Sequence, residues 1–151
     1  MSRFYPEIFP EFEYEPTTDK FVIQRISDGV GEGVVALVDF EPGDIVFRFT
    51  GVFSADVTLF TLRVNDHLHL HDPIFMGKIL HCCDANCTVD MQTRTFTAVK
   101  PIKAGDFVTM DYAETEAHLY RDFECSCGAD NCRGFVQGYL DREEESIQIA
   151  S

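Results

Sequence analysis

The chain has 151 residues, 45% of them hydrophobic, and a formal net charge of −14. This length and apolar content suit one domain with a single buried core. No apolar run is long enough for a membrane-spanning helix and no secretory signal opens the chain, so we expect an intracellular protein, cytoplasmic or, in a eukaryote, nuclear. We expect no membrane partner, and the charge makes nucleic acid a poor partner and favours a basic protein segment, although plain solubility also accounts for the charge.

The first twenty residues combine prolines with aromatic residues. Pro6, Pro10 and Pro16 stand among glutamates and prevent a regular helix or strand. The apolar residues of this segment are too numerous for a free tail: Phe4, Tyr5, Ile8, Phe9, Phe12 and Tyr14. We therefore expect residues 1–20 to form an extended arm that lies on the body of the protein.

Short β-rich runs separated by turn sequences make up most of the remaining chain, which predicts a mainly β domain. The expected strands, in chain order, are 21–26, 34–39, 45–50, 57–64, 67–71, 88–92, 95–100 and 107–112. We expect residues 73–80 to form a short helix or a bend, and residues 117–123 to form a turn or two of helix. Within 67–71 the alternation places three histidines on one strand face. We favour a solvated face over a metal site there: His67, His69 and His71.

Six cysteines in an intracellular chain indicate metal ligands or thiol chemistry rather than disulfides. Three of them have the spacing Cys-x-Cys-x4-Cys: Cys125, Cys127 and Cys132. Gly128 allows the backbone to turn between them, so three thiolates can occupy three corners of a tetrahedron. A structural zinc site needs a fourth ligand. The remaining cysteines are the candidates, and adjacent ones in extended chain would not both serve: Cys82, Cys83 and Cys87.

Two further segments have the composition of ligand sites. Residues 30–34 read Val-Gly-Glu-Gly-Val between two expected strands. Glycines there allow the backbone to approach a ligand and Glu32 can accept hydrogen bonds from an ammonium group, although any hairpin can carry this pattern. Asp111 and Tyr112 end the last expected strand. A tyrosine hydroxyl at such a position can orient a nucleophile, but an ordinary core tyrosine gives the same pattern.

Taken in order, these segments resemble a SET domain followed by a post-SET cysteine loop, over residues 21–138. Residues 30–34 are similar to the opening segment of the family, and residues 80–87 (Leu-His-Cys-Cys-Asp-Ala-Asn-Cys) to its Asn-His-Ser-Cys-x-Pro-Asn motif. Residues 105–112 (Gly-Asp-Phe-Val-Thr-Met-Asp-Tyr) resemble its Gly-Glu-Glu-Leu-Thr-Tyr-Asp-Tyr segment, and residues 123–134 its post-SET loop.

The resemblance implies a mainly β SET fold of short twisted sheets with a C-terminal zinc loop. The segment that ends at Tyr112 would pass through a loop next to His81 in a knot-like threading. The implied organisation is an N-terminal arm over 1–20, a SET domain over 21–116, a post-SET zinc loop over 117–138 and an acidic tail over 139–151.

SET domains are protein-lysine methyltransferases that use S-adenosylmethionine, so the resemblance also implies site residues. Tyr112 matches the catalytic tyrosine of the family. The implied ligands of a structural Zn²⁺ are Cys83, Cys125, Cys127 and Cys132. The implied cofactor-binding residues are Gly31, Glu32, Gly33, Leu80, His81 and Phe135. The implied substrate is a basic lysine-containing protein or peptide, such as a histone tail.

Among the departures from the family pattern, Cys82 for serine and Ala85 for proline are mild, and two others bear on function. Leu80 replaces the motif asparagine, which removes a hydrogen bond to the cofactor worth about 1.5–3 kcal/mol. Met110 replaces the aromatic residue of the lysine channel, so the sequence does not predict the degree of methylation. These departures leave two other interpretations open. The chain is then either a SET-like binding or regulatory module, or a small-molecule enzyme that uses S-adenosylmethionine on the same scaffold.

Overall fold

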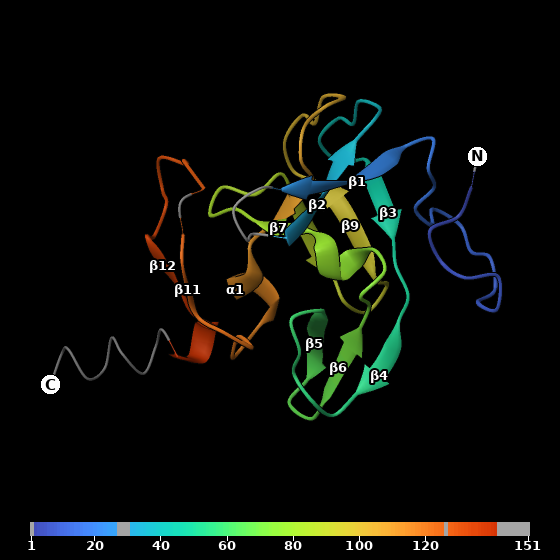
Figure 1. Ribbon diagram of the computed structural model, residues 1–151. Coiled ribbons are helices and arrows are strands. Elements are labelled where there is room, and N and C mark those ends of the chain that lie inside the picture. Colours follow the sequence, from blue (N-terminus) through green and yellow to red (C-terminus); the bar gives the residue numbers. More distant parts are fainter. Residues whose placement is uncertain (1, 27–30, 126, 142–151) are drawn as a thin grey trace, which may run out of the picture.

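The chain folds into several small β-sheets, as the computed structural model of residues 2–26, 31–125 and 127–141 shows (Figure 1). An antiparallel ribbon pairs β1 (Phe21–Ile26) with β2 (Gly31–Ala36). One three-stranded antiparallel sheet has the order β3 (Ile45–Arg48), β9 (Thr95–Ala98) and β8 (Cys87–Asp90). A second has the order β4 (Val52–Ser54), β6 (Leu68–His71) and β5 (Thr61–Asn65). The prediction of a mainly β domain is confirmed.

Two small pairs and two short helices complete the described elements. Strand β7 (Leu80–His81) pairs in parallel with β10 (Thr109–Met110), and β11 (Phe123–Glu124) pairs antiparallel with β12 (Phe135–Val136). The helices are the 3₁₀ turn η1 (Met76–Lys78) and α1 (Tyr112–Thr115). Figure 1 shows β11 and β12 on the side of the molecule opposite the N-terminal segment. No helix in the described part of the chain is long and apolar enough to cross a membrane.

The expected elements match the structure best where the turns are shortest. The first strand has the predicted bounds, and the predicted hairpin around Thr93 and Arg94 is the β8–β9 pair. Strand β2 begins earlier than expected, at Gly31, whose positive φ of 93° suits a glycine. Residue 30 of the glycine motif and residues 142–151 of the predicted acidic tail lie outside the described residues.

The helix predicted over 117–123 is wrong, because residues 117–122 are bends and irregular chain and Phe123 begins β11. The helical turn lies immediately upstream and begins at Tyr112. Asp111 has extended backbone and its side chain accepts a hydrogen bond from the Ala113 N–H at 3.0 Å, which caps the turn. The predicted strand 107–112 is therefore shortened to β10, and Tyr112 leaves the strand as the first residue of a helix.

Packed phenylalanines form the centre of the core. The ring of Phe47 stacks on that of Phe96 at a centroid distance of 4.4 Å and meets Phe75 edge-on at 4.8 Å. Phe21 also contacts Phe75 edge-on, at 5.3 Å. All four rings are at most 1% exposed. These contacts bring together β1, β3, β9 and the segment before η1, so the core fixes the elements that carry the site.

The N-terminal segment contacts the body through its aromatic residues. Phe4 packs on Phe75 at 4.9 Å, and Tyr5 is only 3% exposed. The Tyr5 hydroxyl donates a hydrogen bond of 2.6 Å to the carboxylate of Asp72, which also accepts three backbone N–H bonds at the start of the segment that leads to η1. The same hydroxyl accepts from the Thr50 N–H at 3.2 Å. One buried tyrosine therefore links the segment to two separate parts of the body.

We predict that Tyr5→Phe lowers the free energy of unfolding by about 2 kcal/mol, because the buried Asp72 carboxylate and the Thr50 N–H each lose a partner. Urea unfolding followed by circular dichroism measures the change. Tyr14→Phe is the matched control, since the Tyr14 ring lies in the same segment and is 46% exposed. Equal stability of the two variants would contradict the role given to Tyr5.

Candidate active site

Residues 79–87 and 107–112 lie side by side, as the predicted threading requires. Beyond the parallel pairing of β7 with β10, Asn86 holds the two segments together. Its side-chain amide accepts from the Thr109 N–H at 2.9 Å and donates to the Phe107 carbonyl at 2.8 Å. Its backbone N–H donates to the Thr109 hydroxyl at 3.0 Å. Asn86 therefore fixes the distance between the two motif segments.

This arrangement places Tyr112 against the chain just before β7. Its hydroxyl donates a hydrogen bond of 2.6 Å to the Ile79 carbonyl, and its backbone N–H donates to His81 Nδ1 at 3.1 Å. Burial raises the pKa of Tyr112 to about 12, so the hydroxyl stays neutral near pH 7. The side chain thus offers a fixed, uncharged oxygen atom rather than a base.

A cavity of about 120 Å³ adjoins Tyr112. Its apolar walls come from β5, η1, the Ile79 segment, β10 and β11, and they include Leu62, Met76, Ile79, Met110 and Phe123. One buried acid, Glu116, also lines it, and Glu116 is 4% exposed. Desolvation raises the pKa of Glu116 to about 7. The cavity therefore combines a mainly apolar lining with Tyr112, the buried acid Glu116 and, at an exposed position, the cation Arg121.

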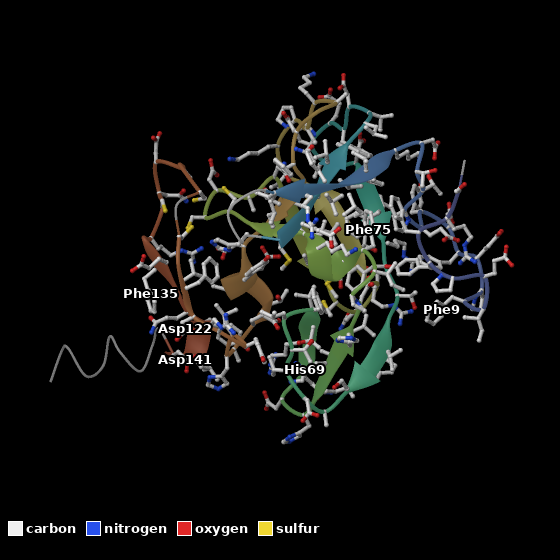
Figure 2. The ribbon with its side chains drawn as sticks, viewed as in Figure 1. Phe9, His69, Phe75, Asp122, Phe135 and Asp141 are labelled. Carbon is white, nitrogen blue, oxygen red and sulfur yellow. The ribbon has the colours of Figure 1, made fainter. Side chains whose placement is uncertain are left out.

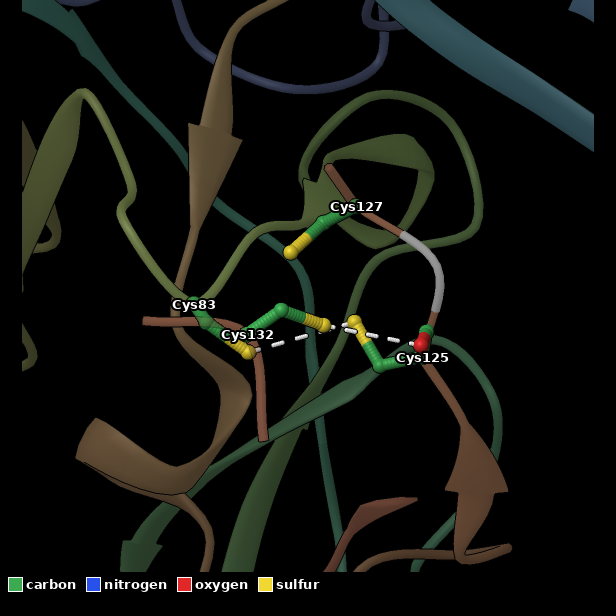
Figure 3. A group of neighbouring side chains, drawn as sticks. All are labelled: Cys83, Cys125, Cys127 and Cys132. Atoms are coloured by element: carbon green, nitrogen blue, oxygen red, sulfur yellow. Dashed lines mark hydrogen bonds between the residues drawn. The ribbon is translucent and has the colours of Figure 1, made fainter. Parts of the chain in front are cut away.

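Four cysteine thiols gather on the side of the motif segments that faces the C-terminal loop (Figure 3). The Sγ atoms of Cys83, Cys125, Cys127 and Cys132 all lie within 4.8 Å of one another. A tetrahedral zinc ion with Zn–S bonds of 2.3 Å separates its sulfur atoms by about 3.8 Å. The Cys83 and Cys125 Sγ atoms are 3.9 Å apart, which is close to this spacing, so the four thiols suit a Zn²⁺ ion.

The structure also selects among the three candidates for the fourth thiol. Cys83 joins the cluster, whereas Cys82 and Cys87 do not. Cys87 begins β8 and is 2% exposed in the core, where burial raises the pKa of its thiol to about 12. Such a thiol stays protonated and packs as a small apolar residue.

Three N–H groups surround the Cys83 sulfur atom. The backbone N–H and the Nε of Arg133 each lie 3.4 Å from it, and so does His81 Nε2. Because His81 Nδ1 accepts from the Tyr112 N–H, the ring proton belongs on Nε2 and points toward the sulfur. Burial also lowers the pKa of His81 to about 4, so the ring is neutral. A thiolate at Cys83 is thus stabilised by three donors.

Arg133 makes a second connection between the cysteine cluster and the tyrosine segment. Its Nη2 donates to Asp111 Oδ1 at 2.7 Å, while its Nε points at the Cys83 sulfur. Asp111 is also the residue that caps α1. The position of Tyr112 is therefore linked to Cys83 on two routes, through His81 and through Arg133 with Asp111.

Most of the residues expected at the cofactor site lie on two strands, β2 and β7. Gly33 is buried in β2, and a Cβ atom there would lie 2.9 Å from Leu80 Cδ1, so the packing requires glycine. Gly31 and Glu32 are exposed, and Glu32 pairs with Lys78 at 3.5 Å. Leu80 thus packs against the glycine segment, although it offers no hydrogen bond.

Phe135 is the last of the expected cofactor residues, and its role at the cofactor stays a prediction. It lies on β12, paired with Glu124, and 48% of it is exposed (Figure 2). The solvated histidine face predicted on 67–71 is wrong for His69, which is 9% exposed because β6 is the central strand of its sheet. No metal-binding cluster other than the four cysteines occurs among residues 2–26, 31–125 and 127–141.

Sequence reasoning missed Glu116, Asn86 and Arg133 as site residues. Asn86 and Arg133 lie within segments that resemble family motifs, and this position could have marked them as site residues. The residue spacing does not predict which groups they contact. Glu116 belongs to no motif. It reaches the cavity only because α1 ends after one turn and the next residue folds inward.

No protein-family model matches the sequence. Methyltransferase flvH from Aspergillus flavus is 34% identical over 114 residues, which cover 72% of this chain and 62% of that protein. Histone-lysine N-methyltransferase Set2 from Drosophila melanogaster is 30% identical over 139 residues, which cover 76% of this chain and 6% of that protein. The chain thus spans about three fifths of the first relative and a small part of the second.

Solved structures of low sequence identity share the fold. The crystal structure of KRYPTONITE in complex with mCHG DNA and SAH superposes with a TM-score of 0.64 at 20% identity, covering 83% of this chain and 30% of that one. The Chaetomium thermophilum polycomb repressive complex 2 gives a TM-score of 0.53 at 22% identity, covering 61% of this chain and 15% of that one. With the relatives and the four-cysteine cluster, this fold shows that the chain belongs to the SET-domain family.

Proposed function

We propose that this chain is a methyltransferase of the SET type that uses S-adenosylmethionine and methylates a lysine amine. The observation that carries the proposal is the fixed Tyr112 hydroxyl, which donates to the Ile79 carbonyl at the wall of an apolar cavity. The hydroxyl hydrogen is already donated to the Ile79 carbonyl, so the lone pairs of the oxygen atom would face the reacting groups. Related proteins are named as histone-lysine N-methyltransferases, and one solved relative holds SAH together with an H3(1–15) peptide.

When bound, S-adenosylmethionine supplies a methyl group on a sulfonium centre that an amine can attack in line. The contribution of the chain is alignment and exclusion of water. Tyr112 offers an uncharged oxygen, and neutral oxygen atoms next to a cationic methyl group favour its position without trapping it. The apolar walls, among them Met76, Ile79 and Met110, disfavour a charged amine and so help to keep the attacking nitrogen neutral.

For the acceptor we propose a lysine on a basic protein or peptide, such as a histone tail. The net charge of −14 supports this, because an acidic surface attracts a lysine-rich segment and speeds its encounter. An amine carried by a small molecule would meet the same cavity.

For the cysteine cluster we propose a structural Zn²⁺ held by Cys83, Cys125, Cys127 and Cys132. Four thiolates leave no open position, so the metal does no chemistry. It joins the loop around 125–132 to the Tyr112 segment and contributes folding free energy to a region that has only the short β11–β12 pair.

The first test concerns Tyr112. We predict that Tyr112→Phe lowers kcat about 100-fold, as the loss of one oriented polar group at a reacting centre does elsewhere, with little change in the KM of the cofactor. The assay follows methyl transfer from S-adenosylmethionine to basic lysine peptides. Tyr14→Phe, in the N-terminal segment, is the control. Undiminished activity of the Tyr112 variant would rule out the assigned role.

The second test concerns the metal. We predict one zinc ion per purified chain, with strong loss of zinc in Cys83→Ser and Cys125→Ser because each removes one of four ligands. Elemental analysis of the purified proteins gives the metal content. Cys82→Ser should retain zinc, since Cys82 lies outside the cluster. If Cys82→Ser lost zinc and Cys83→Ser kept it, the ligand set would be wrong.

The third test concerns Leu80. Leu80→Asn restores an amide at the position where the family motif has asparagine, and asparagine is small enough for the space beside Gly33. We predict tighter binding of S-adenosylmethionine by about ten- to a hundredfold, measured by titration calorimetry. Leu80→Ala removes the same apolar group without adding a donor and should not tighten binding. Equal affinities for the Asn and Ala variants would show that residue 80 makes no contact with the cofactor.

A further inference from the structure

The buried acid Glu116 is not explained by the family motifs or by the fold. Its backbone N–H donates to the Tyr112 carbonyl at 3.0 Å, one helical turn away, and its own carbonyl accepts from the Tyr139 N–H at 3.0 Å. The residue is therefore held on both sides. Glu116 lines the same cavity as Tyr112 and is almost completely shielded from bulk water.

The carboxylate of Glu116 has neutral hydrogen-bonding neighbours, the Arg63 backbone and the Thr115 side chain. One oxygen, Oε2, accepts a hydrogen bond of 2.8 Å from the Arg63 backbone N–H. The guanidinium group of Arg63 turns away, pairing with Asp66 and lying 5.9 Å over the ring of Tyr139. Among residues 2–26, 31–125 and 127–141, no ion pair involves Glu116, while ion pairs are formed elsewhere.

Burying a carboxylate without a cation is costly, and proteins ordinarily avoid it or pair the charge. Desolvation is the main cause that raises the pKa of Glu116 to about 7, with the Arg63 backbone bond and charge opposing it. A structural role would be served by an apolar residue or by glutamine. An acid at the wall of a cavity has a clear use if a cation enters that cavity.

We propose that Glu116 recognises the ammonium group of the methyl acceptor in this cavity. The inference rests on the proposed function and narrows it to acceptors that are primary alkylammonium ions. The apolar residues Leu62, Met76 and Ile79 would enclose the alkyl chain, and the carboxylate would pair with the charged end. The cavity of about 120 Å³ suits such a chain, since an apolar cavity of about 150 Å³ in another protein holds benzene.

The same carboxylate can take the proton that the ammonium ion must lose. The proton passes from nitrogen to Glu116, which leaves a neutral amine and a neutral carboxyl group in an apolar space. The nitrogen lone pair then forms the bond to the methyl carbon while the carbon–sulfur bond breaks, and its electron pair stays on sulfur. The products are a methylated ammonium ion and S-adenosylhomocysteine, so charge is conserved.

The alkylammonium group can come from a lysine side chain or from a free amine, and the experiment separates these sources. Calorimetry measures binding of a basic lysine peptide, of free lysine and of n-pentylammonium to the zinc-loaded protein, so that binding is read without catalysis. The variant is Glu116→Gln, which keeps an oxygen for the Arg63 N–H. Glu124→Gln, at an exposed position on β11, is the control.

We expect Glu116→Gln to weaken binding of the acceptor at least tenfold, while binding of S-adenosylmethionine and the melting temperature change little. If the peptide binds and the free amines do not, the acceptor is a protein. If the free amines bind, the acceptor is a small molecule. Unchanged acceptor affinity in Glu116→Gln would overturn the inference and leave the proposed function intact. Binding of amines without any methyl transfer would instead contradict the proposed function and keep the role of Glu116.

Discussion

The hydrogen bonds of Asn86 are the constraint on which the site depends. Its amide and backbone N–H join residues 79–87 to residues 107–110 with three hydrogen bonds, next to the parallel β7–β10 pairing. Each such bond contributes only about 1 kcal/mol, but together they decide which atoms face each other. The hydrogen bond from the Tyr112 hydroxyl to the Ile79 carbonyl depends on this alignment of the two segments. The cavity wall and the position of Cys83 follow from the same alignment.

The cysteine cluster and the tyrosine are parts of one network. His81 bridges the Cys83 sulfur and the Tyr112 backbone, and Arg133 bridges the same sulfur and Asp111. The proposed zinc ion would therefore set the geometry around Tyr112 without taking part in a chemical step. This gives a physical reason why the proposed zinc loop lies next to the proposed methyl-transfer site. The charge on the thiolate orders the donors around it, and these donors order the tyrosine segment.

Much of this arrangement is predictable from the sequence, because it depends on local patterns. The bounds of β1, the β8–β9 hairpin and the four-cysteine ligand set follow from alternation, turn residues and spacing, with the family resemblance needed to choose Cys83 over Cys82. The order of the motifs also identifies the fold. Each strand, turn and motif involved is encoded by residues that are close together in the sequence, although the motifs themselves are far apart.

What could not be predicted depends on contacts between distant residues. Glu116 accepts from the backbone of Arg63, 53 positions earlier, so no local pattern reveals it as a buried acid. The helical turn begins at Tyr112 and not in residues 117–123. The Asp111 side chain caps this turn directly after the short strand β10, and the sequence pattern does not show that the strand ends there. His69 is buried because β6 receives partners on both sides, which alternation alone does not show.

Because Cys83 is connected to the Tyr112 segment, we expect cofactor binding to depend on the metal at the four-cysteine cluster. The most direct test is a calorimetric titration of S-adenosylmethionine into zinc-loaded protein and into the same protein after removal of zinc with a chelator. We predict saturable binding of one cofactor per chain in the first sample and strongly weakened binding in the second. Equal affinity in both samples, or no binding to the zinc-loaded protein, would contradict the account.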